Sequence, residues 1–135
     1  MKVKLDPGAF MPTRAHMYDA GLDLYSPIDT WLHPGQNLTI DTGVHMAIPE
    51  GCVGLITSKS GLMKKGITSR GTVDAGYTGS ISAVLFNHGE EGYMIRRGDK
   101  ITQIVILKVE LPPIELVDEL EPTDRGDGGF GSTGR

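Results

Sequence analysis

The stretch Ile101-Thr-Gln-Ile-Val-Ile-Leu-Lys-Val109 is apolar on both of the faces that alternate along a strand, apart from Thr102 and Gln103. Such a run predicts a central strand that is buried on both sides of a sheet. The segment Leu111-Pro-Pro113 follows, and it ends the strand because proline cannot donate to a ladder of hydrogen bonds. The stretch therefore predicts a β-protein whose last core strand ends before Leu111.

Shorter segments with strand character precede this run, and the clearest of them alternates Ile81, Ala83 and Leu85 with Ser80 and Ser82. The others are 38–42, 44–48 and 53–57, the last two joined by the turn sequence Pro49-Glu-Gly51. Strands at this spacing predict a sandwich, barrel or jelly roll. The 19 glycines and 8 prolines disfavour long helices, so we expect only one short helix around Leu62–Lys65.

The chain of 135 residues predicts one folded domain, with a change of composition near its end. Residues 1–109 hold 11 basic and 10 acidic residues, whereas residues 110–135 hold 2 basic and 7 acidic residues. We expect a β-domain over residues 1–114, followed by an acidic connector and a flexible glycine-rich arm over residues 115–135.

Several features limit the partners and the location. The basic cluster between Lys59 and Arg70 suits a small anion but is too short for duplex nucleic acid. No apolar run approaches the roughly 20 residues that span a bilayer, and the first residues lack an apolar signal region. Cys52 is the only cysteine, so an internal disulfide is excluded. We therefore expect a cytoplasmic protein with neither a membrane nor a nucleic acid as partner.

The last residues, Arg125-Gly-Asp-Gly-Gly-Phe-Gly-Ser-Thr-Gly-Arg135, combine glycines with groups that bind nucleotides. Arg125 can form paired hydrogen bonds to a phosphate, and the Phe130 ring can stack on a base. Ser132 and Thr133 add hydroxyl donors. The alternative for this segment alone is a solvated chain end.

Two internal segments predict phosphate and metal contacts. Asp19 and Asp23 flank Gly21, where a carboxylate could hold a hydrated Mg²⁺, although turn aspartates are the ordinary alternative. The segment 58–66 brings hydroxyls, ammonium groups and glycine to a strand end, as in a phosphate-binding loop, but it lacks the P-loop order. An ordinary solvated turn is the alternative here.

Two further segments predict a base site and a buried amide. In Gly71-Thr-Val-Asp-Ala-Gly-Tyr-Thr-Gly79, Asp74 is the candidate general base and Tyr77 could pack on a sugar, with an Asx turn as the alternative. Gln103 lies in an apolar strand and needs a partner, either a ligand or a core group. The four histidines, at positions 16, 33, 45 and 88, lack metal-ligand spacing.

Taken in order, five segments resemble the five motifs of the homotrimeric dUTP diphosphatase (dUTPase) family. They are Ala20-Gly-Leu-Asp-Leu-Tyr25, Lys59-Ser-Gly-Leu62, 71–79, Gly98-Asp-Lys-Ile-Thr-Gln103 and 125–134. The resemblance implies a distorted jelly-roll/β-barrel that assembles as a homotrimer, with active sites between subunits. It also implies cleavage of dUTP to dUMP and pyrophosphate, with Mg²⁺ held by the triphosphate.

The resemblance assigns roles residue by residue. Asp74 would activate the water that attacks the α-phosphorus, and Asp23 would contact the metal through water. The implied phosphate contacts are Lys59, Ser60, Gly61 and Gln103. The implied nucleoside contacts are Thr72, Val73, Ser82 and, under the deoxyribose, Tyr77. The implied lid consists of Arg125 on the γ-phosphate, Phe130 on uracil, and Gly131, Ser132 and Thr133.

Two positions depart from the family pattern. The second motif usually has Pro-Arg-Ser-Gly, and here Lys59 replaces the arginine, which keeps the charge but loses the bidentate geometry. Thr68 stands just upstream of the third motif, where the family usually has an asparagine, so this substrate contact differs. Uracil would be selected by a tight hairpin that rejects the polar pattern of cytosine and the methyl group of thymine.

Two other functions stay open on the sequence. A dCTP deaminase on a related fold would need a glutamate beside the base, but Glu50, Glu90 and Glu91 lie outside the five segments. A nucleotide-gated binding protein, whose partner recognises the closed arm, is the alternative from a different class.

Overall fold

The structure is a computed structural model that describes residues 1–134. It is almost entirely β, since its helix α1 (Ser60–Met63) is a single turn. The first strands are β1 (Val3–Leu5), β2 (Gly21–Tyr25), β3 (Thr30–Leu32), β4 (Asn37–Asp41) and β5 (Val44–Met46). The later strands are β6 (Cys52–Thr57), β7 (Ile67–Asp74), β8 (Ser82–Asn87), β9 (Tyr93–Ile95) and β10 (Lys100–Lys108).

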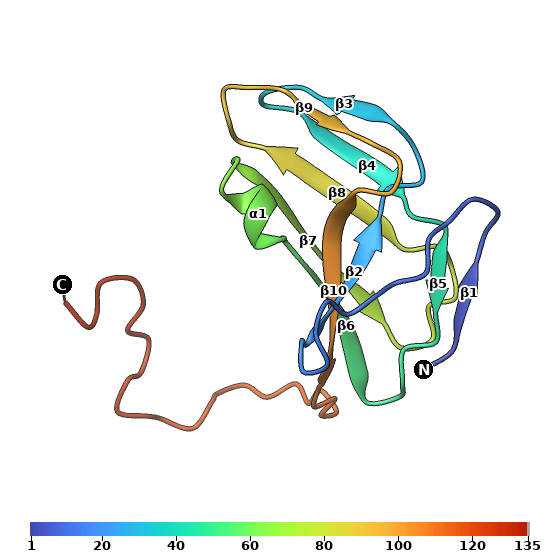
Figure 1. The fold of residues 1–135 in the computed structure, drawn as a ribbon. Coiled ribbons are helices and arrows are strands. Elements are labelled where there is room, and N and C mark those ends of the chain that lie inside the picture. Colours follow the sequence, from blue (N-terminus) through green and yellow to red (C-terminus); the bar gives the residue numbers. More distant parts are fainter. Residues whose placement is uncertain (135) are drawn as a thin grey trace.

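Six strands form one antiparallel sheet in the order β2-β10-β6-β7-β8-β4. This sheet curls, and two short ladders, β1 with β5 and β3 with β9, lie beside it (Figure 1). The expected all-β, distorted jelly-roll/β-barrel fold is confirmed. The sheet order is far from the chain order, so segments distant in sequence become neighbours.

Strand β10 is the expected interior strand, and it pairs with β2 on one side and β6 on the other. Ile101 and Ile104 are 1% and 0% exposed, which confirms burial of the first half of the strand. The second half differs from the expectation, because Leu107 is 43% exposed. In a single chain, no second layer covers this end of the strand.

Strand β7 changes its partner midway. Its first residues, 67–69, pair with β8, whereas residues 70–74 pair with β6. Strand β8 meanwhile continues along β4. The second half of β7 and the start of β8 therefore diverge and form a fork in the sheet (Figure 1). Strands that move from one layer to another in this way form the corners of β-barrels and sandwiches.

The core consists of two apolar clusters, one on each side of this corner. The first contains Leu24, Val44, Met46, Ile48, Ile56, Val73, Ile81 and Ile104. The second contains Leu32, Ile40, Leu62, Ile67, Ala83, Leu85, Ile95 and Ile101. The alternation at Ile81, Ala83 and Leu85 is confirmed, since all three are at most 2% exposed.

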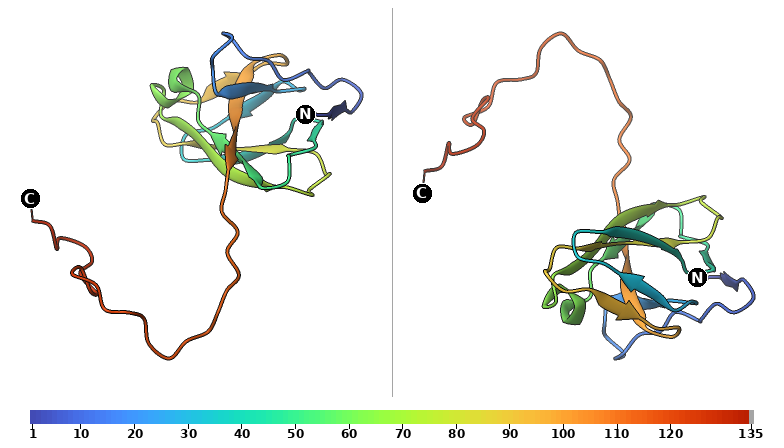
Figure 2. Two further views of the ribbon diagram at one scale, coloured as in Figure 1. Left: turned by 90° about the horizontal axis from the view of Figure 1, so that it is seen from below. Right: turned by 90° about the horizontal axis from the view of Figure 1, so that it is seen from above.

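The helix is short, and the chain end is irregular. The helix starts two residues earlier than expected and ends at Met63, because Gly66 adopts a φ of 77° that turns the chain into β7. After β10 no strand or helix forms through residue 134, and the arm extends away from the barrel (Figure 2). No helix in the described chain is both long and apolar enough to cross a bilayer.

Candidate active site

The fork between β7 and β8 holds a pocket of about 300 Å³. One wall is residues 70–74 of β7, and the other is residues 80–82 with Val84. Each wall strand pairs with a neighbour on its outer side only, so the inner edges carry main-chain groups without a ladder partner. Such edges can donate and accept hydrogen bonds along the rim of a flat ring.

The expected base-site residues all line this pocket: Thr72, Val73, Asp74, Tyr77 and Ser82. Asp74 is exposed at the end of β7, and its carbonyl accepts a hydrogen bond from the Tyr77 amide at 3.2 Å. The Tyr77 hydroxyl donates to the Ser80 carbonyl at 3.1 Å. The loop is wider than the tight hairpin we expected, because β7 and β8 are unpaired where they line the pocket.

Glycine is required where the Tyr77 ring crosses the loop. A Cβ atom on Gly79 would lie 2.3 Å from the Tyr77 hydroxyl oxygen, far inside ordinary contact. Gly76 has a φ of 90°, which side chains rarely adopt. The two glycines therefore let the loop reverse while the ring of Tyr77 stays over the pocket wall.

A second polar cluster lies at the other end of the sheet, around Asp23 on β2. Its carboxylate is bound by Lys59, and Oδ2 lies 2.8 Å from Nζ of Lys100. Asp19, Gly21 and Gln103 line the same hollow. The two lysines balance the charges of Asp19 and Asp23, and their ammonium groups can bind an anion.

The ionisation of Asp23 follows from its neighbours. Asp23 is only 4% exposed, and burial disfavours its charged carboxylate. The hydrogen bonds and charges of Lys100 and Lys59 outweigh this, and they lower the pKa of Asp23 below its usual 3.8. Asp23 in turn raises the pKa of Lys100. Both shifts favour the charged forms of Asp23 and Lys100 at neutral pH.

Lys100 was missed by the sequence reasoning for a geometric reason. A bulge between Lys100 and Thr102 places an extra residue of β10 opposite β2. Strict alternation assigns Lys100 and Gln103 to opposite faces, but the bulge puts both on the face of Asp23. Only the ladder register reveals this, although Lys100 lies inside one of the five segments.

Gln103 finds its expected partner within the chain. Its Nε2 donates to the Ser58 carbonyl at 3.2 Å, so the core-partner alternative holds for this atom. Its Oε1 lies against Gly21, where an added Cβ would approach within 2.2 Å. The absence of a side chain at Gly21 thus leaves room for the amide in the hollow.

Three other expected residues lie in α1 and in the first half of β7. Ser60 and Gly61 begin α1 and are exposed, and a Cβ on Gly61 would meet open space. Thr68 lies in the paired part of β7, and its hydroxyl contacts Nε2 of His88 at 2.9 Å. The structure therefore places Thr68 outside both polar hollows.

The two halves of the candidate site are far apart in one chain. Asp74 pairs with Val53 at the start of β6, whereas Lys59 lies two residues beyond its end. Six strand steps separate these points, or about 20 Å at ~3.3 Å per residue. One chain therefore does not bring Asp74 and Lys59 to the same small ligand.

The arm residues also lie away from the fork. Phe130 is fully exposed, and Arg125 Nε donates to the Gly128 carbonyl at 3.0 Å within a local turn. Gly131, Ser132 and Thr133 form further turns at the chain end, with Ser132 N donating to the Gly129 carbonyl at 3.1 Å. The arm extends away from the barrel (Figure 2), and none of its residues lines the fork pocket of its own chain. Its mobility stays a prediction.

The side chains in the hollow limit how a metal ion could be bound. Among residues 1–134, no group of three or more histidine, cysteine, aspartate or glutamate side chains could form a protein cage for an ion. Asp23 and Asp19, which share one hollow, could supply carboxylate oxygens to a hydrated Mg²⁺. These residues fit an ion that is held mainly by a bound ligand.

A pocket edged by main-chain groups, together with a separate hollow that holds two lysines, fits a class of protein, the nucleotide-binding β-barrels. A family model described as dUTPase matches residues 8–134. This chain belongs to the dUTPase family, as the five segments led us to expect.

Curated relatives and solved structures agree with this placement. Two proteins named deoxyuridine 5'-triphosphate nucleotidohydrolase resemble the chain closely. The Mycobacterium leprae protein is 49% identical, over 98% of this chain and 92% of its own length. The Nocardia farcinica protein is 46% identical, over 97% of this chain and 82% of its own.

Two phage enzymes share the fold. The dUTPase of Staphylococcus bacteriophage 80alpha, solved with dUPNHPP, superimposes with a TM-score of 0.92 and 34% identity, over 99% of this chain and 98% of the other. A mutant dUTPase of phage phi11 of S. aureus, described with a structural Mg(II) ion, gives a TM-score of 0.80 and 33% identity, over 87% and 96%.

Proposed function

We propose that this chain hydrolyses dUTP to dUMP and pyrophosphate, with Asp74 as the general base. The observation that carries the proposal is the pocket in the β7–β8 fork, which gathers Asp74, Tyr77 and the free main-chain edges. Family membership over residues 8–134 supports the same activity.

The fork binds the nucleoside. Uracil lies between the inner edges of β7 and β8, where Val73 and Ser82 offer main-chain hydrogen bonds and Thr72 lines the entrance. Tyr77 packs under the deoxyribose. Asp74, exposed at the strand end, accepts a proton from the water that attacks the α-phosphorus. The reaction breaks the bond between the α-phosphorus and the bridging oxygen, and pyrophosphate leaves.

The hollow around Asp23, with its two lysines, binds the phosphates. Lys59, Ser60, Gly61 and the Gln103 amide neutralise and orient the chain of phosphates, which is most of what phosphoryl transfer requires. Bound with the triphosphate, Mg²⁺ would add charge neutralisation, and Asp23 would hold its hydration shell. Lys59 and Lys100 keep Asp23 charged.

The two halves meet in a homotrimer. The separation of about 20 Å between Asp74 and Lys59, at ~3.3 Å per residue, requires that another copy supplies the phosphate half. Exposed apolar groups support such burial: Leu107 on β10 is 43% exposed, and Leu111, Ile114 and Leu116 beyond β10 are at least 77% exposed.

The arm completes the site of a neighbouring copy. We treat residues 1–114 as the catalytic β-domain and 115–135 as a connector and lid. Arg125 grips the γ-phosphate, Phe130 stacks on uracil, and Gly131, Ser132 and Thr133 close over the nucleotide. Sixteen residues from Val109 to Arg125 span about 50 Å at ~3.3 Å each, which is long enough to reach another subunit. The lone Cys52 suits the reducing cytoplasm, where we place the reaction.

Pyrophosphate release from dUTP, dCTP and dTTP, measured side by side with purified protein, tests the proposal. We expect release from dUTP alone, and no ammonia from dCTP. Asp74→Asn should nearly abolish turnover while dUTP binding survives, because the amide keeps the shape but cannot take the proton. Asp118→Asn, in the connector, is the matched control and should match wild type.

Two results would contradict the proposal. Ammonia release from dCTP would indicate a deaminase, although no glutamate lines the fork pocket. Unchanged turnover in Asp74→Asn would eliminate Asp74 as the base.

A further inference from the structure

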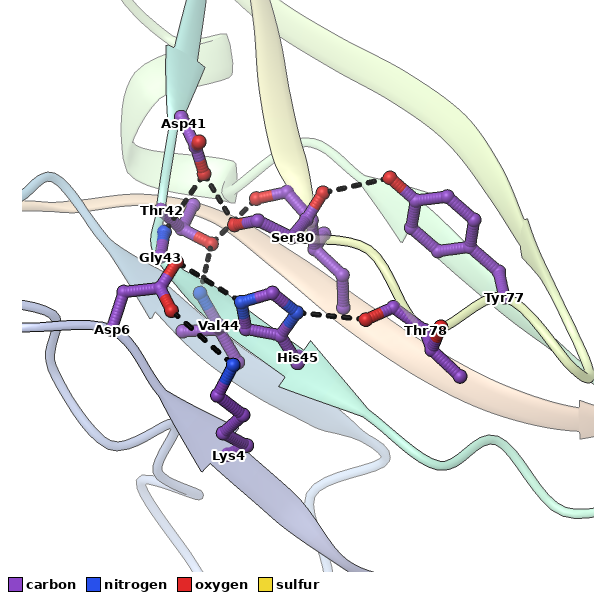
Figure 3. Close-up of polar contacts among 11 residues, drawn as sticks. Lys4, Asp6, Asp41, Thr42, Gly43, Val44, His45, Tyr77, Thr78 and Ser80 are labelled. Atoms are coloured by element: carbon purple, nitrogen blue, oxygen red, sulfur yellow. Dashed lines mark hydrogen bonds and ion pairs between the residues drawn. The ribbon is translucent and has the colours of Figure 1, made fainter.

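His45, on β5, connects the N-terminal strand with the loop that carries Tyr77 (Figure 3). Its Nδ1 lies 2.8 Å from the main-chain carbonyl oxygen of Thr78. Its Nε2 lies 3.0 Å from Oδ2 of Asp6, just after β1. The His45 side chain is 18% exposed, so both contacts are partly shielded from water.

Both partners of the His45 ring are hydrogen-bond acceptors. A main-chain carbonyl cannot donate, and neither can an ionised carboxylate. A neutral imidazole has one donor nitrogen and one acceptor nitrogen, so it satisfies only one of the two contacts. The observed pair of contacts therefore requires the doubly protonated imidazolium.

The loop held by His45 is the one that forms the nucleoside pocket. Thr78 directly follows Tyr77, whose hydroxyl donates to the Ser80 carbonyl. On the other side of the loop, the Ser80 hydroxyl donates to Asp41 at the end of β4. Ile81, the last residue of the loop, accepts hydrogen bonds from Thr42 and donates one to the Val44 carbonyl. Among these contacts of the loop with the β4–β5 region, only the one through His45 titrates near neutral pH.

We infer that His45 is a positioning residue for the nucleoside loop, and that its imidazolium strengthens dUTP binding at mildly acidic pH. The inference rests on the proposed function, because it assumes that the fork pocket binds dUTP. His45 does not line that pocket, so it acts through Thr78 and Tyr77 rather than on the substrate. We call the His45 contacts with Asp6 and Thr78 the loop latch.

The direction of the pH effect follows from the contacts. The Thr78 carbonyl, followed by the Asp6 carboxylate, raises the pKa of His45 above its usual 6.5. A raised pKa means that the latch is complete below pH 6.5 and is lost as pH rises through the raised value. Binding of dUTP, which needs the ordered loop, should weaken over the same range.

Other charged groups near His45 also raise or lower its pKa. Lys4, its cross-strand neighbour on β1, opposes protonation, but it also lies 3.8 Å from Oδ1 of Asp6. The Ser80 hydroxyl and the Gly43 amide lower the pKa of Asp41, which therefore stays ionised and favours the imidazolium. Lys2 lines the groove beside the ring. The net effect on the pKa of His45 is upward.

A nitrogen-15 NMR titration of the histidine rings tests the latch directly. The His45 resonances are assigned by their absence in His45→Gln. We expect both ring nitrogens of His45 to be protonated at pH 6, with a pKa above the usual 6.5. A His45 pKa at or below 6.5 would overturn the inference.

Kinetics test the consequence for the substrate. His45→Gln keeps one hydrogen-bond donor but does not titrate, and His33→Gln is the control. We expect the ratio of the KM for dUTP of His45→Gln to that of wild type to be larger at pH 6 than at pH 9, because only the wild-type ring gains its second donor as the pH falls. The kcat ratio should stay constant. Asp6→Asn should move the inflection to lower pH.

The proposed function and the role of His45 can be refuted separately. If wild type releases no pyrophosphate from dUTP, the proposed function is wrong, and the NMR pKa then decides the latch alone. If wild type is active but the KM ratio is independent of pH, the latch does not position the loop, and the inference is wrong.

Discussion

The substitution Gly21→Ala separates the phosphate half of the site from the stability of the fold. Gly21 lies on β2, in the hollow shared with Asp23 and Gln103. An alanine Cβ there would lie 2.2 Å from Oε1 and 3.0 Å from Cδ of Gln103. The Gln103 amide must therefore retreat by about 1 Å to reach an ordinary contact near 3.4 Å.

The expected magnitudes follow from this displacement. The hydrogen bond from Gln103 to the Ser58 carbonyl is lost, which removes about 1 kcal/mol. Replacing a strand glycine by alanine restores roughly 0.5–1 kcal/mol, so the melting temperature should change by only a few degrees. A misplacement of about 1 Å in a substrate contact can reduce the rate by up to ~100-fold, so kcat/KM should fall about 10- to 100-fold.

The assay pairs pyrophosphate release with calorimetry, and Gly54→Ala serves as the contrasting variant. A Cβ on Gly54 would lie 2.7 Å from Cδ1 of the buried Ile104, so this change should lower stability through core strain. Full activity in Gly21→Ala would refute the role of Gln103 in phosphate binding. A loss of activity together with a collapse in melting temperature would refute the claim that the effect is local.

Three further outcomes are expected. Lys59→Arg should keep the Asp23 ion pair and bind dUTP at least as tightly as wild type, because guanidinium engages two phosphate oxygens; a raised Kd by calorimetry would show that the hollow fits only an ammonium. A chain ending at Thr123 should melt within a few degrees of wild type yet lose most of its turnover; a full rate would make the arm dispensable. Because the pKa of Asp23 is lower in the folded protein than its usual 3.8, the ionised carboxylate stabilises the fold at pH values above 3.8, and this contribution is lost as the pH falls through the lower folded value. The melting temperature of wild type should therefore fall more steeply below pH 4 than that of Asp23→Asn. Equal slopes would contradict this role of Asp23.

Much of the fold could be predicted because the local signals agree with the global structure. The alternation around Ile81, the apolar run of β10 and the turn at Gly51 each indicate a strand or a reversal, and the sheet uses them accordingly. The order of the five segments was enough to predict the family. Thr72, Val73, Asp74 and Tyr77 line one pocket, and their nearness in sequence made this grouping easy to predict.

The remainder depends on pairing between distant strands, which local pattern does not encode. The partner change in the middle of β7 produces the fork, yet residues 67–74 carry no signal for it beyond Gly71. The bulge that turns Lys100 toward Asp23 is likewise a property of the ladder with β2. The contact of His45 with Asp6 joins residues 39 positions apart.

The placement of Asp74 and Lys59 at opposite ends of the β6–β7 hairpin has a genetic consequence. If each catalytic centre takes its base from one subunit and its lysine from another, then alleles that encode Asp74→Asn and Lys59→Ala are inactive alone but complement each other in one cell. Random mixing of equal amounts assembles about a quarter of the centres from two intact contributions. Such complementation would show that each active centre is formed by more than one subunit.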